Sequence, residues 1–266
     1  MTSPGEVIAS LPAAGRVVGT ERIKHGLTNE SWLVTTDHDM FVVRISNASE
    51  QPLQINRASE ALILGAVAEA GIGPEVLVCD PSRHLLVTRY LGATWAEEDA
   101  MYGDNIARVA TTLRRLHALA PPPGLHSVDL LAVIDGYLKT LDENSVYISG
   151  TTRVMRARAR EIAEMLQRDS ISRLCHNDVH ALNIVDTRNG LRLIDWEYAG
   201  LGERMFDLAS ICVYHNYGKN QREHLLLAYT AVSDRIGTHR LELACWLFEY
   251  IRDLWEAVRA LQPAAA

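Results

Sequence analysis

The sequence LCHNDVHALNIVDTRNGLRLIDWE, residues 174–197, is the stretch from which the fold of this 266-residue chain is best predicted. Two apolar pieces with β propensity, residues 183–185 and 191–194, flank a turn at residues 187–190 that contains Asn and Gly. Apolar runs on either side of such a turn are typical of a short β-hairpin. We therefore expect a hairpin whose two outer ends lie side by side.

Three oxygen-bearing side chains accompany this hairpin. Asp178 and Asn183 lie at its beginning, five residues apart, and Asp195 directly follows its second strand. Because the two ends of a hairpin meet, the three side chains are predicted to come together. Phosphoryl transfer uses such a set: a carboxylate orients or deprotonates the attacking hydroxyl, and hard oxygen ligands bind magnesium on the nucleotide phosphates. The stretch therefore predicts a phosphoryl-transfer site.

The order of these residues resembles a known family. The pattern H-x-D-x-x-x-x-N, followed by I-D, resembles the catalytic and metal loops of the kinase superfamily. HNDVHALN, LIDWEYAG and FDLA are similar to the small-molecule branch that contains choline/ethanolamine kinases, thiamine kinases and aminoglycoside phosphotransferases, and most similar to the first two. The resemblance runs from residue 15 to residue 255 and is strongest at residues 174–210.

The resemblance implies an α+β, bilobal protein-kinase-like fold. Residues 1–91 would form a nucleotide-binding lobe with a small antiparallel sheet and one helix, and residues 92–266 a larger, mostly helical catalytic and substrate lobe. The local patterns fit this division. They predict strands at residues 17–23, 31–35, 40–45, 76–78 and 85–90, and helices at residues 61–70, 105–119, 130–141 and 152–168.

The resemblance also implies roles at the centre of the chain. Asp178 would orient, and in part deprotonate, the acceptor hydroxyl, while Asn183 and Asp195 would bind Mg²⁺ on the phosphates of ATP. His176 belongs to the same catalytic motif, and we expect its ring to bond the backbone near the metal loop. Asp207, in FDLAS, is expected to accept hydrogen bonds from the N–H groups of the catalytic loop.

Nucleotide-binding residues are implied for the first lobe. The loop HGLTNE, residues 25–30, resembles a phosphate loop in which Gly26, Thr28 and Asn29 meet phosphate oxygens, although it lacks G-x-G-x-x-G. Arg44 stands where the family places its phosphate-contacting base.

The carboxylate that holds this base would come from the following helix. Glu60 resembles the residue that pairs with the strand base, but Arg57, three residues earlier, is an alternative local partner for Glu60. Arg89, Tyr90 and Leu91 resemble the hinge whose backbone groups bond the adenine edge.

The acceptor pocket is expected in the last seventy residues, where aromatic residues and carboxylates gather. Aromatic faces attract cations by about 0.5–2 kcal/mol per ring. The tentative substrate residues are Glu197, Tyr198, Tyr214, Trp246, Glu249 and Trp255. Trp246 and Trp255 also suit a helix core. Glu197 would assist a second metal, face the cation, or pair with Arg204, and His180 would line the substrate mouth or fill the loop.

Charge and composition restrict the partners. The chain carries 26 Lys and Arg against 33 Asp and Glu, a formal charge of −7, with no long basic run. A nucleic-acid partner is therefore disfavoured, and a cationic small molecule suits the balance better. No apolar run approaches the length of a membrane span, and the first residues lack the pattern of a signal peptide. We expect no membrane partner and a cytoplasmic location.

The leading hypothesis is an ATP- and Mg²⁺-dependent kinase that phosphorylates the primary hydroxyl of a small cationic alcohol. Choline or ethanolamine comes first, thiamine second and an aminoglycoside third. A pseudokinase that serves as a binding module is the alternative from another class. It would have lost one of the three oxygen-bearing groups, but Asp178, Asn183 and Asp195 are all present.

Overall fold

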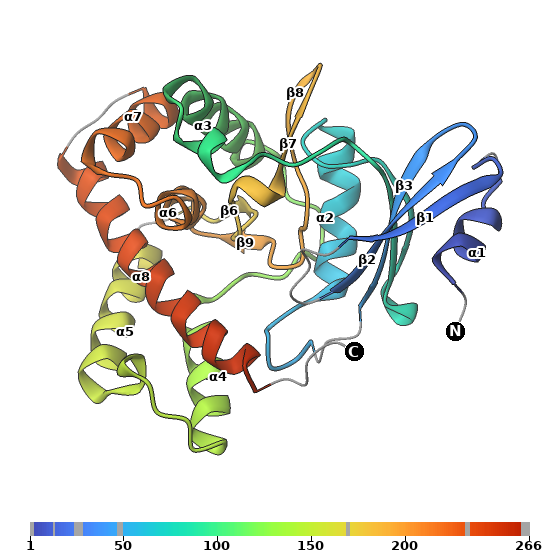
Figure 1. Ribbon diagram of the computed structural model, residues 1–266. Coiled ribbons are helices and arrows are strands. Elements are labelled where there is room, and N and C mark those ends of the chain that lie inside the picture. Colours follow the sequence, from blue (N-terminus) through green and yellow to red (C-terminus); the bar gives the residue numbers. More distant parts are fainter. Residues whose placement is uncertain are drawn as a thin grey trace.

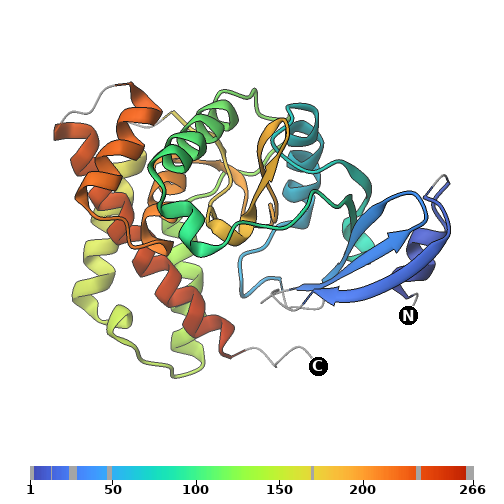
Figure 2. The same cartoon turned by 45° about the horizontal axis from the view of Figure 1, so that its top comes forward.

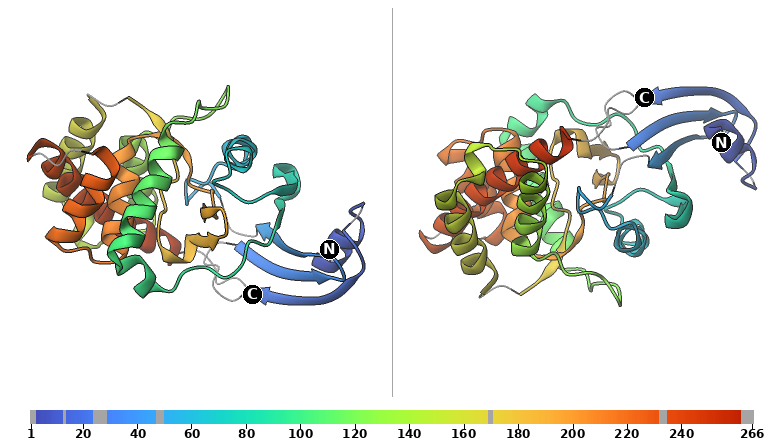
Figure 3. Two further views of the ribbon diagram at one scale, coloured as in Figure 1. Left: turned by 90° about the horizontal axis from the view of Figure 1, so that it is seen from above. Right: turned by 90° about the horizontal axis from the view of Figure 1, so that it is seen from below.

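The structure, a computed structural model, describes residues 3–12, 14–23, 29–46, 50–168, 171–231 and 235–261. A small sheet with two helices forms one end of the molecule, and a larger, mostly helical part forms the other (Figure 1). In both views of Figure 3 the sheet lies to one side of the helical part. The α+β fold predicted from the sequence is confirmed.

The N-terminal sheet has five antiparallel strands in the order β1-β2-β3-β5-β4. All five predicted strands are present, with small differences at their ends. They are β1 (Val17–Ile23), β2 (Asn29–Thr36), β3 (Met40–Ser46), β4 (Val76–Asp80) and β5 (Leu85–Arg89). Short α1 (Pro4–Ala9) packs on one face of the sheet, and its Ser3 cap accepts a hydrogen bond from the Glu6 N–H.

Strand β3 occupies the centre of this sheet, and its alternation decides where Arg44 points. Phe41 and Val43 are buried in the cluster that includes Val7 and Ile8 of α1. Because successive side chains on a strand point to opposite faces, Arg44 projects from the other face. That face looks toward the helical part, where Arg44 lines a cavity.

Helix α2 (Arg57–Glu69) begins four residues before the predicted start at residue 61. The prediction was based on the apolar stretch alone. In the structure Asn56 caps the helix by accepting a hydrogen bond from the Ser59 N–H, so the polar residues before the apolar stretch form the first turn of the helix. The helix ends as predicted, since Gly71 adopts φ +67°, a value that favours glycine. The buried face of α2 belongs to the same apolar cluster as the helical part.

The helical part is built around α6 and α8. Residues 205–213 of α6 are all buried, and the long α8 runs along the helical part beside them (Figure 2). Its helices are α3 (Gly103–His117), α4 (Leu130–Glu143), α5 (Arg153–Arg168), α6 (Arg204–Tyr214), α7 (Lys219–Thr230) and α8 (Arg235–Arg259). The predicted helices at 105–119, 130–141 and 152–168 are confirmed. Among the described residues, no helix is both long and apolar enough to cross a bilayer.

Short strands and single 3₁₀ turns complete this part. The strands are β6 (Arg173–Cys175), β7 (Ile184–Thr187), β8 (Gly190–Leu193) and β9 (Gly200–Gly202), and the turns are η1 (Pro81–Arg83), η2 (Glu97–Met101), η3 (Ser149–Thr151) and η4 (Ala181–Asn183). The predicted hairpin is the pair β7–β8. Asn183 lies in the turn η4 just before β7, and the Leu193 N–H donates to the Ile72 carbonyl at 2.7 Å, which fixes the hairpin beside α2.

Candidate active site

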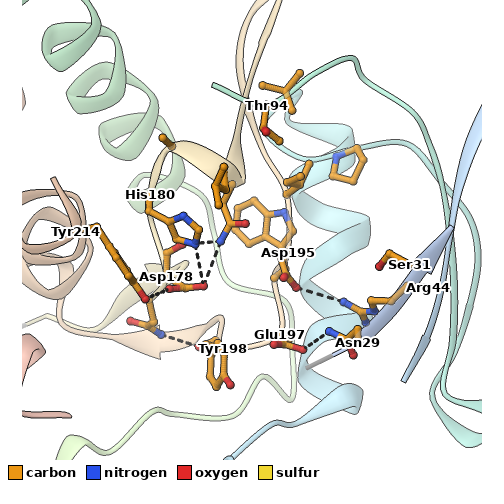
Figure 4. Close-up of a pocket in the computed structure, with 18 of the residues that line it drawn as sticks. Asn29, Ser31, Arg44, Thr94, Asp178, His180, Asp195, Glu197, Tyr198 and Tyr214 are labelled. Atoms are coloured by element: carbon orange, nitrogen blue, oxygen red, sulfur yellow. Dashed lines mark hydrogen bonds and ion pairs between the residues drawn. The ribbon is translucent and has the colours of Figure 1, made fainter. Parts of the chain in front are cut away.

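A cavity of about 740 Å³ lies between the N-terminal sheet and the helical part (Figure 4). Both parts line it. The predicted site residues among its lining are Asn29, Arg44, Arg89, Tyr90, Leu91, Asp178, Asn183, Asp195, Glu197, Tyr198, Tyr214 and Trp255. Gly26 and Thr28 lie outside the described residues, so their predicted phosphate contacts stay a prediction. His180, undecided from the sequence, also lines the cavity beside Asp178.

The hairpin brings Asp178, Asn183 and Asp195 to one wall of this cavity. The Asn183 Nδ2 donates to the Asp178 backbone carbonyl at 2.9 Å and to its Oδ2 at 3.1 Å. Asp195 follows β8 with φ +62°, a conformation that Asp and Asn tolerate better than most residues. Burial and the neighbouring Glu197 carboxylate raise the pKa of Asp195 well above its usual value, although the Arg44 cation opposes this. A carboxylate in such surroundings favours a nearby cation.

The Asp178 carboxylate is held by three side chains. The Tyr214 hydroxyl donates to Oδ1 at 3.0 Å, and the His180 Nε2 lies 3.6 Å from Oδ2, on the same oxygen that Asn183 contacts. The His180 ring packs on Tyr214 at 4.7 Å between ring centroids. Burial alone would raise the pKa of Asp178, but the neighbouring His180 and His176 rings and the Tyr214 hydroxyl together outweigh it, so the pKa lies below its usual value. Asp178 is therefore ionised at neutral pH.

His176 stabilises the loop that carries Asp178 without lining the cavity. The ring is fully buried, and burial lowers its pKa, which keeps it neutral. Its Nε2 donates to the Ile194 carbonyl at 2.9 Å, so its Nδ1 is free to accept the Asp178 N–H at 3.3 Å. His176 does not line the cavity, and its ring bonds the backbone beside Asp195, as expected.

Asp207 anchors the same loop from α6. Its Oδ2 accepts the His176 N–H at 2.9 Å and its Oδ1 accepts the Asn177 N–H at 2.6 Å, as expected from FDLAS. The His117 Nε2 also lies 2.9 Å from Oδ2, and the His117 Nδ1 lies 2.7 Å from the Tyr229 hydroxyl. Helices α3, α6 and α7 thus converge on the loop that carries His176 and Asn177.

Asp207→Ala should destabilise the protein by about 2–4 kcal/mol, because it leaves buried donors of the loop without an acceptor. For a chain of this size that corresponds to about 5–10 °C in the midpoint of thermal unfolding. Circular dichroism measures it. Asp186→Ala is the control, because Asp186 pairs with Arg108 at the surface and about half of its side chain is exposed. A wild-type midpoint for Asp207→Ala would contradict the anchoring role.

The predicted pair of Arg44 and Glu60 is confirmed. Two parallel hydrogen bonds of 2.7 Å join the Arg44 Nη atoms to the two Glu60 oxygens. The alternative partner is present as well, since the Arg57 Nη1 donates to Glu60 Oε2 at 2.9 Å. The Arg44 Nη1 also lies 3.5 Å from Asp195 Oδ1. A fixed cation therefore faces the cavity beside the acids of the hairpin.

Glu197 has partners that its sequence did not indicate. Its carboxylate points toward the N-terminal part (Figure 4), where Oε2 lies 3.1 Å from the Arg57 Nη1 and accepts the Asn29 Nδ2 at 2.8 Å. The alternative of an ion pair with Arg204 is wrong, because the Arg204 guanidinium packs over the Tyr229 ring. Glu197 lines the cavity, yet it acts as a contact between the two parts of the molecule.

The predicted hinge lies at the cavity, but two of its backbone donors are already used. The Arg89 N–H donates to the Glu75 carbonyl and the Tyr90 N–H to the Met40 carbonyl, both at 2.9 Å. The Leu91 N–H donates no hydrogen bond within the part of the chain that the structure describes. Of the three, Leu91 is the one able to donate to an adenine edge.

The tentative substrate residues divide into two groups. Tyr198 and Trp255 line the cavity as an edge-on pair, and the Trp255 Nε1 donates to the Tyr198 hydroxyl at 2.8 Å. Tyr214 lines it too, as the partner of Asp178. Trp246 and Glu249 do not: Trp246 stacks on Tyr250 beneath the Arg158 guanidinium, and Glu249 lies at the surface near Arg252.

The face of α8 explains this correction. Phe248, Ile251, Arg252 and Trp255 follow one another at helical spacing and all line the cavity, so residues 246 and 249 point elsewhere. Tyr137 of α4 also lines the cavity and was not predicted, because nothing in the sequence near it indicates a site. Helical spacing from Trp255 would have identified Phe248.

The family model described as "Phosphotransferase enzyme family" matches residues 19–244. The chain belongs to this phosphotransferase enzyme family. The match confirms the family that was predicted from residues 174–210, and it confirms that the protein is a phosphotransferase.

Three relatives illustrate the similarity. The protein LicA of Haemophilus influenzae is 28% identical over 225 residues, which are 82% of this chain and 65% of that protein. The thiamine kinase of Salmonella paratyphi B is 39% identical over 89 residues, 33% of this chain and 26% of that protein. A choline/ethanolamine kinase family protein from Mesorhizobium loti has a crystal structure with a TM-score of 0.78 and 29% identity, covering 95% of this chain and 84% of that one. This chain thus spans slightly less than two thirds of the length of this LicA protein and 84% of the Mesorhizobium loti chain.

Proposed function

We propose that this phosphotransferase is an ATP- and Mg²⁺-dependent kinase whose acceptor is the primary hydroxyl of a small cationic alcohol, choline or ethanolamine first. One observation carries the proposal: Asp178, Asn183 and Asp195 line the same cavity as Arg44, which Glu60 holds by two hydrogen bonds, and aromatic rings line that cavity too. The names of the relatives, choline/ethanolamine kinase family protein and thiamine kinase, support the same class of substrate.

The nucleotide is assigned to the side of the cavity that the sheet forms. Residues 1–91 would act as the nucleotide-binding lobe and residues 92–266 as the catalytic and substrate lobe. The Leu91 N–H is the donor proposed for the adenine edge. Arg44 keeps its charge at any physiological pH, and its Nη atoms carry further N–H groups besides those that donate to Glu60, so it is proposed to contact phosphate oxygens.

The residues proposed to hold Mg²⁺ fit this ion. Because the Asn183 Nδ2 is bound to Asp178, the Asn183 Oδ1 is the atom left for a ligand, and Asp195 adds a carboxylate beside it. Amide and carboxylate oxygens are the ligands that Mg²⁺ prefers. When bound there, Mg²⁺ supplies positive charge that offsets the charge developing on the phosphates.

Asp178 performs the chemical step on the acceptor side. Its ionised carboxylate accepts a hydrogen bond from the acceptor hydroxyl and orients the oxygen toward the terminal phosphorus. As the new oxygen–phosphorus bond forms, the bond to the ADP oxygen breaks and the hydroxyl proton passes to Asp178. The low pKa of Asp178 makes it a weak base, so orientation is its larger contribution.

The side chains at the acceptor end of the cavity suit an acceptor with a single positive charge better than a polycationic one. Tyr198, Tyr214 and Trp255 offer aromatic faces to a cation, and Glu256 lines the same end. Arg252 lies there too, 3.9 Å from the Glu256 carboxylate. A second cation within the pocket opposes a polycationic aminoglycoside. Thiamine, with one fixed charge and a primary alcohol, remains the second candidate.

An acceptor panel tests the proposal. Purified protein with Mg²⁺ and γ-labelled ATP is offered choline, ethanolamine, thiamine, kanamycin and homoserine separately, and labelled product is measured. We expect the highest kcat/KM with choline or ethanolamine. If thiamine gave the highest kcat/KM, thiamine would become the proposed acceptor and the proposed mechanism would stay the same. If no acceptor were labelled and any ATP turnover survived Asp178→Asn, the protein would be a binding module instead.

A further inference from the structure

Arg57 is a buried cation at a position where helix stability does not favour one. It is the first residue of α2 and only 7% exposed. The amino end of a helix carries partial positive charge, so a cation there is disfavoured. The reason for an arginine at this position must therefore lie in its partners.

Four oxygen-bearing side chains surround the Arg57 guanidinium. Its Nε donates to Glu50 at 2.9 Å, its Nη2 donates to the Asn29 Oδ1 at 2.8 Å, and its Nη1 lies 2.9 Å from Glu60 and 3.1 Å from Glu197. Every nitrogen of the fork is used. Lysine, a point charge with three donors, cannot reproduce this planar arrangement.

One of these partners comes from the other part of the molecule. Glu197 lies two residues after Asp195 and 140 residues after Arg57 in the chain. The Asn29 Nδ2 donates to the same Glu197 oxygen that Arg57 contacts. Glu60 and Glu197, which share the Arg57 Nη1, are both almost fully buried.

We propose that Arg57 is a positioning residue that couples the nucleotide side of the cavity to the metal-binding loop, an inference that rests on the proposed kinase function. Through Glu60 it fixes the carboxylate that orients Arg44. Through Glu197 it fixes the segment that carries Asp195, and it holds the Glu197 carboxylate toward the sheet. The Arg57 guanidinium thus holds Arg44 and Asp195 at fixed positions relative to each other before any substrate binds.

The buried charges give this coupling its strength. A buried carboxylate that loses its cationic partner destabilises its surroundings far more than an exposed one does. If Arg57 is removed, Glu60 retains Arg44, but the buried Glu197 carboxylate loses its contact with the Arg57 guanidinium. The loop that carries Asp195 should then move away from its place opposite Arg44.

A double-mutant cycle with nucleotide binding tests the coupling. Arg57→Met, Glu197→Ala and the double variant are compared by calorimetry with ADP and MgCl₂, and by kcat/KM for ATP with the best acceptor of the panel. Each single variant should weaken ADP binding about tenfold, and the double variant should be no weaker than the worse single one. Effects that multiply would overturn the inference, and so would wild-type binding in Arg57→Met.

Hydrogen exchange without nucleotide separates this inference from the proposed function. In Arg57→Met, amides at residues 57–61 and 194–199 should both exchange faster, whereas Arg83→Met, on the exposed turn η1, should leave both unchanged. Faster exchange at residues 57–61 alone would overturn the coupling. If Arg57→Met did not fold, Glu197→Ala would carry the test, with faster exchange at 57–61 expected. A wild-type protein that neither bound ADP nor phosphorylated any acceptor would refute the function, while the exchange result would still decide the coupling.

Discussion

Asp178→Asn is expected to lower kcat by about 10²–10⁴-fold, the range of a lost general base or orienting carboxylate. The amide has no negative charge to orient the acceptor hydroxyl and cannot take its proton. It keeps the size of the side chain and an oxygen for the Tyr214 hydroxyl. ATP binding should change little, because the nucleotide-binding residues proposed are elsewhere. Steady-state kinetics and calorimetry with ADP together separate the two effects.

The substituted amide has one structural consequence that needs a second variant. Its NH₂ group would meet the Asn183 Nδ2, which now donates to Asp178 Oδ2. Asp178→Ala removes that conflict and should lose kcat to a similar extent. Asp186→Asn, at the solvent-exposed end of the hairpin, is the matched control and should retain wild-type kinetics. Weak ADP binding with normal kcat in either Asp178 variant would contradict the assignment.

The parts of the fold that follow from local patterns could be predicted from the sequence. Apolar residues alternate in β3, so Phe41 and Val43 go to the α1 side and Arg44 to the cavity side. The turn at residues 187–190 sets the register of the hairpin, which brings Asn183 and Asp195 together. These features depend on neighbours only a few residues away. They can therefore be predicted from the sequence alone.

The contacts that join distant segments could not be predicted in the same way. The Arg57–Glu197 pair spans the two parts of the molecule, and the sequence around Arg57 indicated only its local partner, Glu60. The side of α8 that faces the cavity depends on how α8 packs along α6, which is why the sequence did not indicate that Trp255 lines the cavity and Trp246 does not. The number of aromatic residues in a helix does not indicate which of their side chains point into the cavity.

Tyr214 shows that a residue that lines the site can make a contact that its sequence does not indicate. It was expected as one aromatic wall of a cation pocket. In the structure its ring packs against His180 and Phe248, and its hydroxyl donates to the Asp178 carboxylate. That hydroxyl therefore helps to fix the carboxylate that is proposed to orient the acceptor. The sequence gives no sign of this contact, because 36 residues separate the two side chains.

Asp195→Asn is expected to abolish most of the Mg²⁺-dependent turnover. Loss of a charged metal ligand removes several kcal/mol of transition-state stabilisation, which corresponds to about 10²–10⁴-fold in rate. Asparagine is the right replacement because Asp195 has φ +62°, and asparagine tolerates this conformation better than alanine does. The rate is measured against MgCl₂ concentration at saturating ATP and acceptor. The half-saturating MgCl₂ concentration should rise as the maximal rate falls.

The thermal stability of the same variant shows whether the loss is chemical. Burial and the Glu197 carboxylate disfavour the ionised form of Asp195, so a neutral amide there relieves repulsion between acids. Asp195→Asn should therefore unfold at a temperature no lower than wild type while its turnover is lost. A loss of stability would mean that Asp195 is a structural residue. An unchanged dependence on MgCl₂ would remove it from the metal site, because a ligand cannot be neutralised without weakening the bound ion.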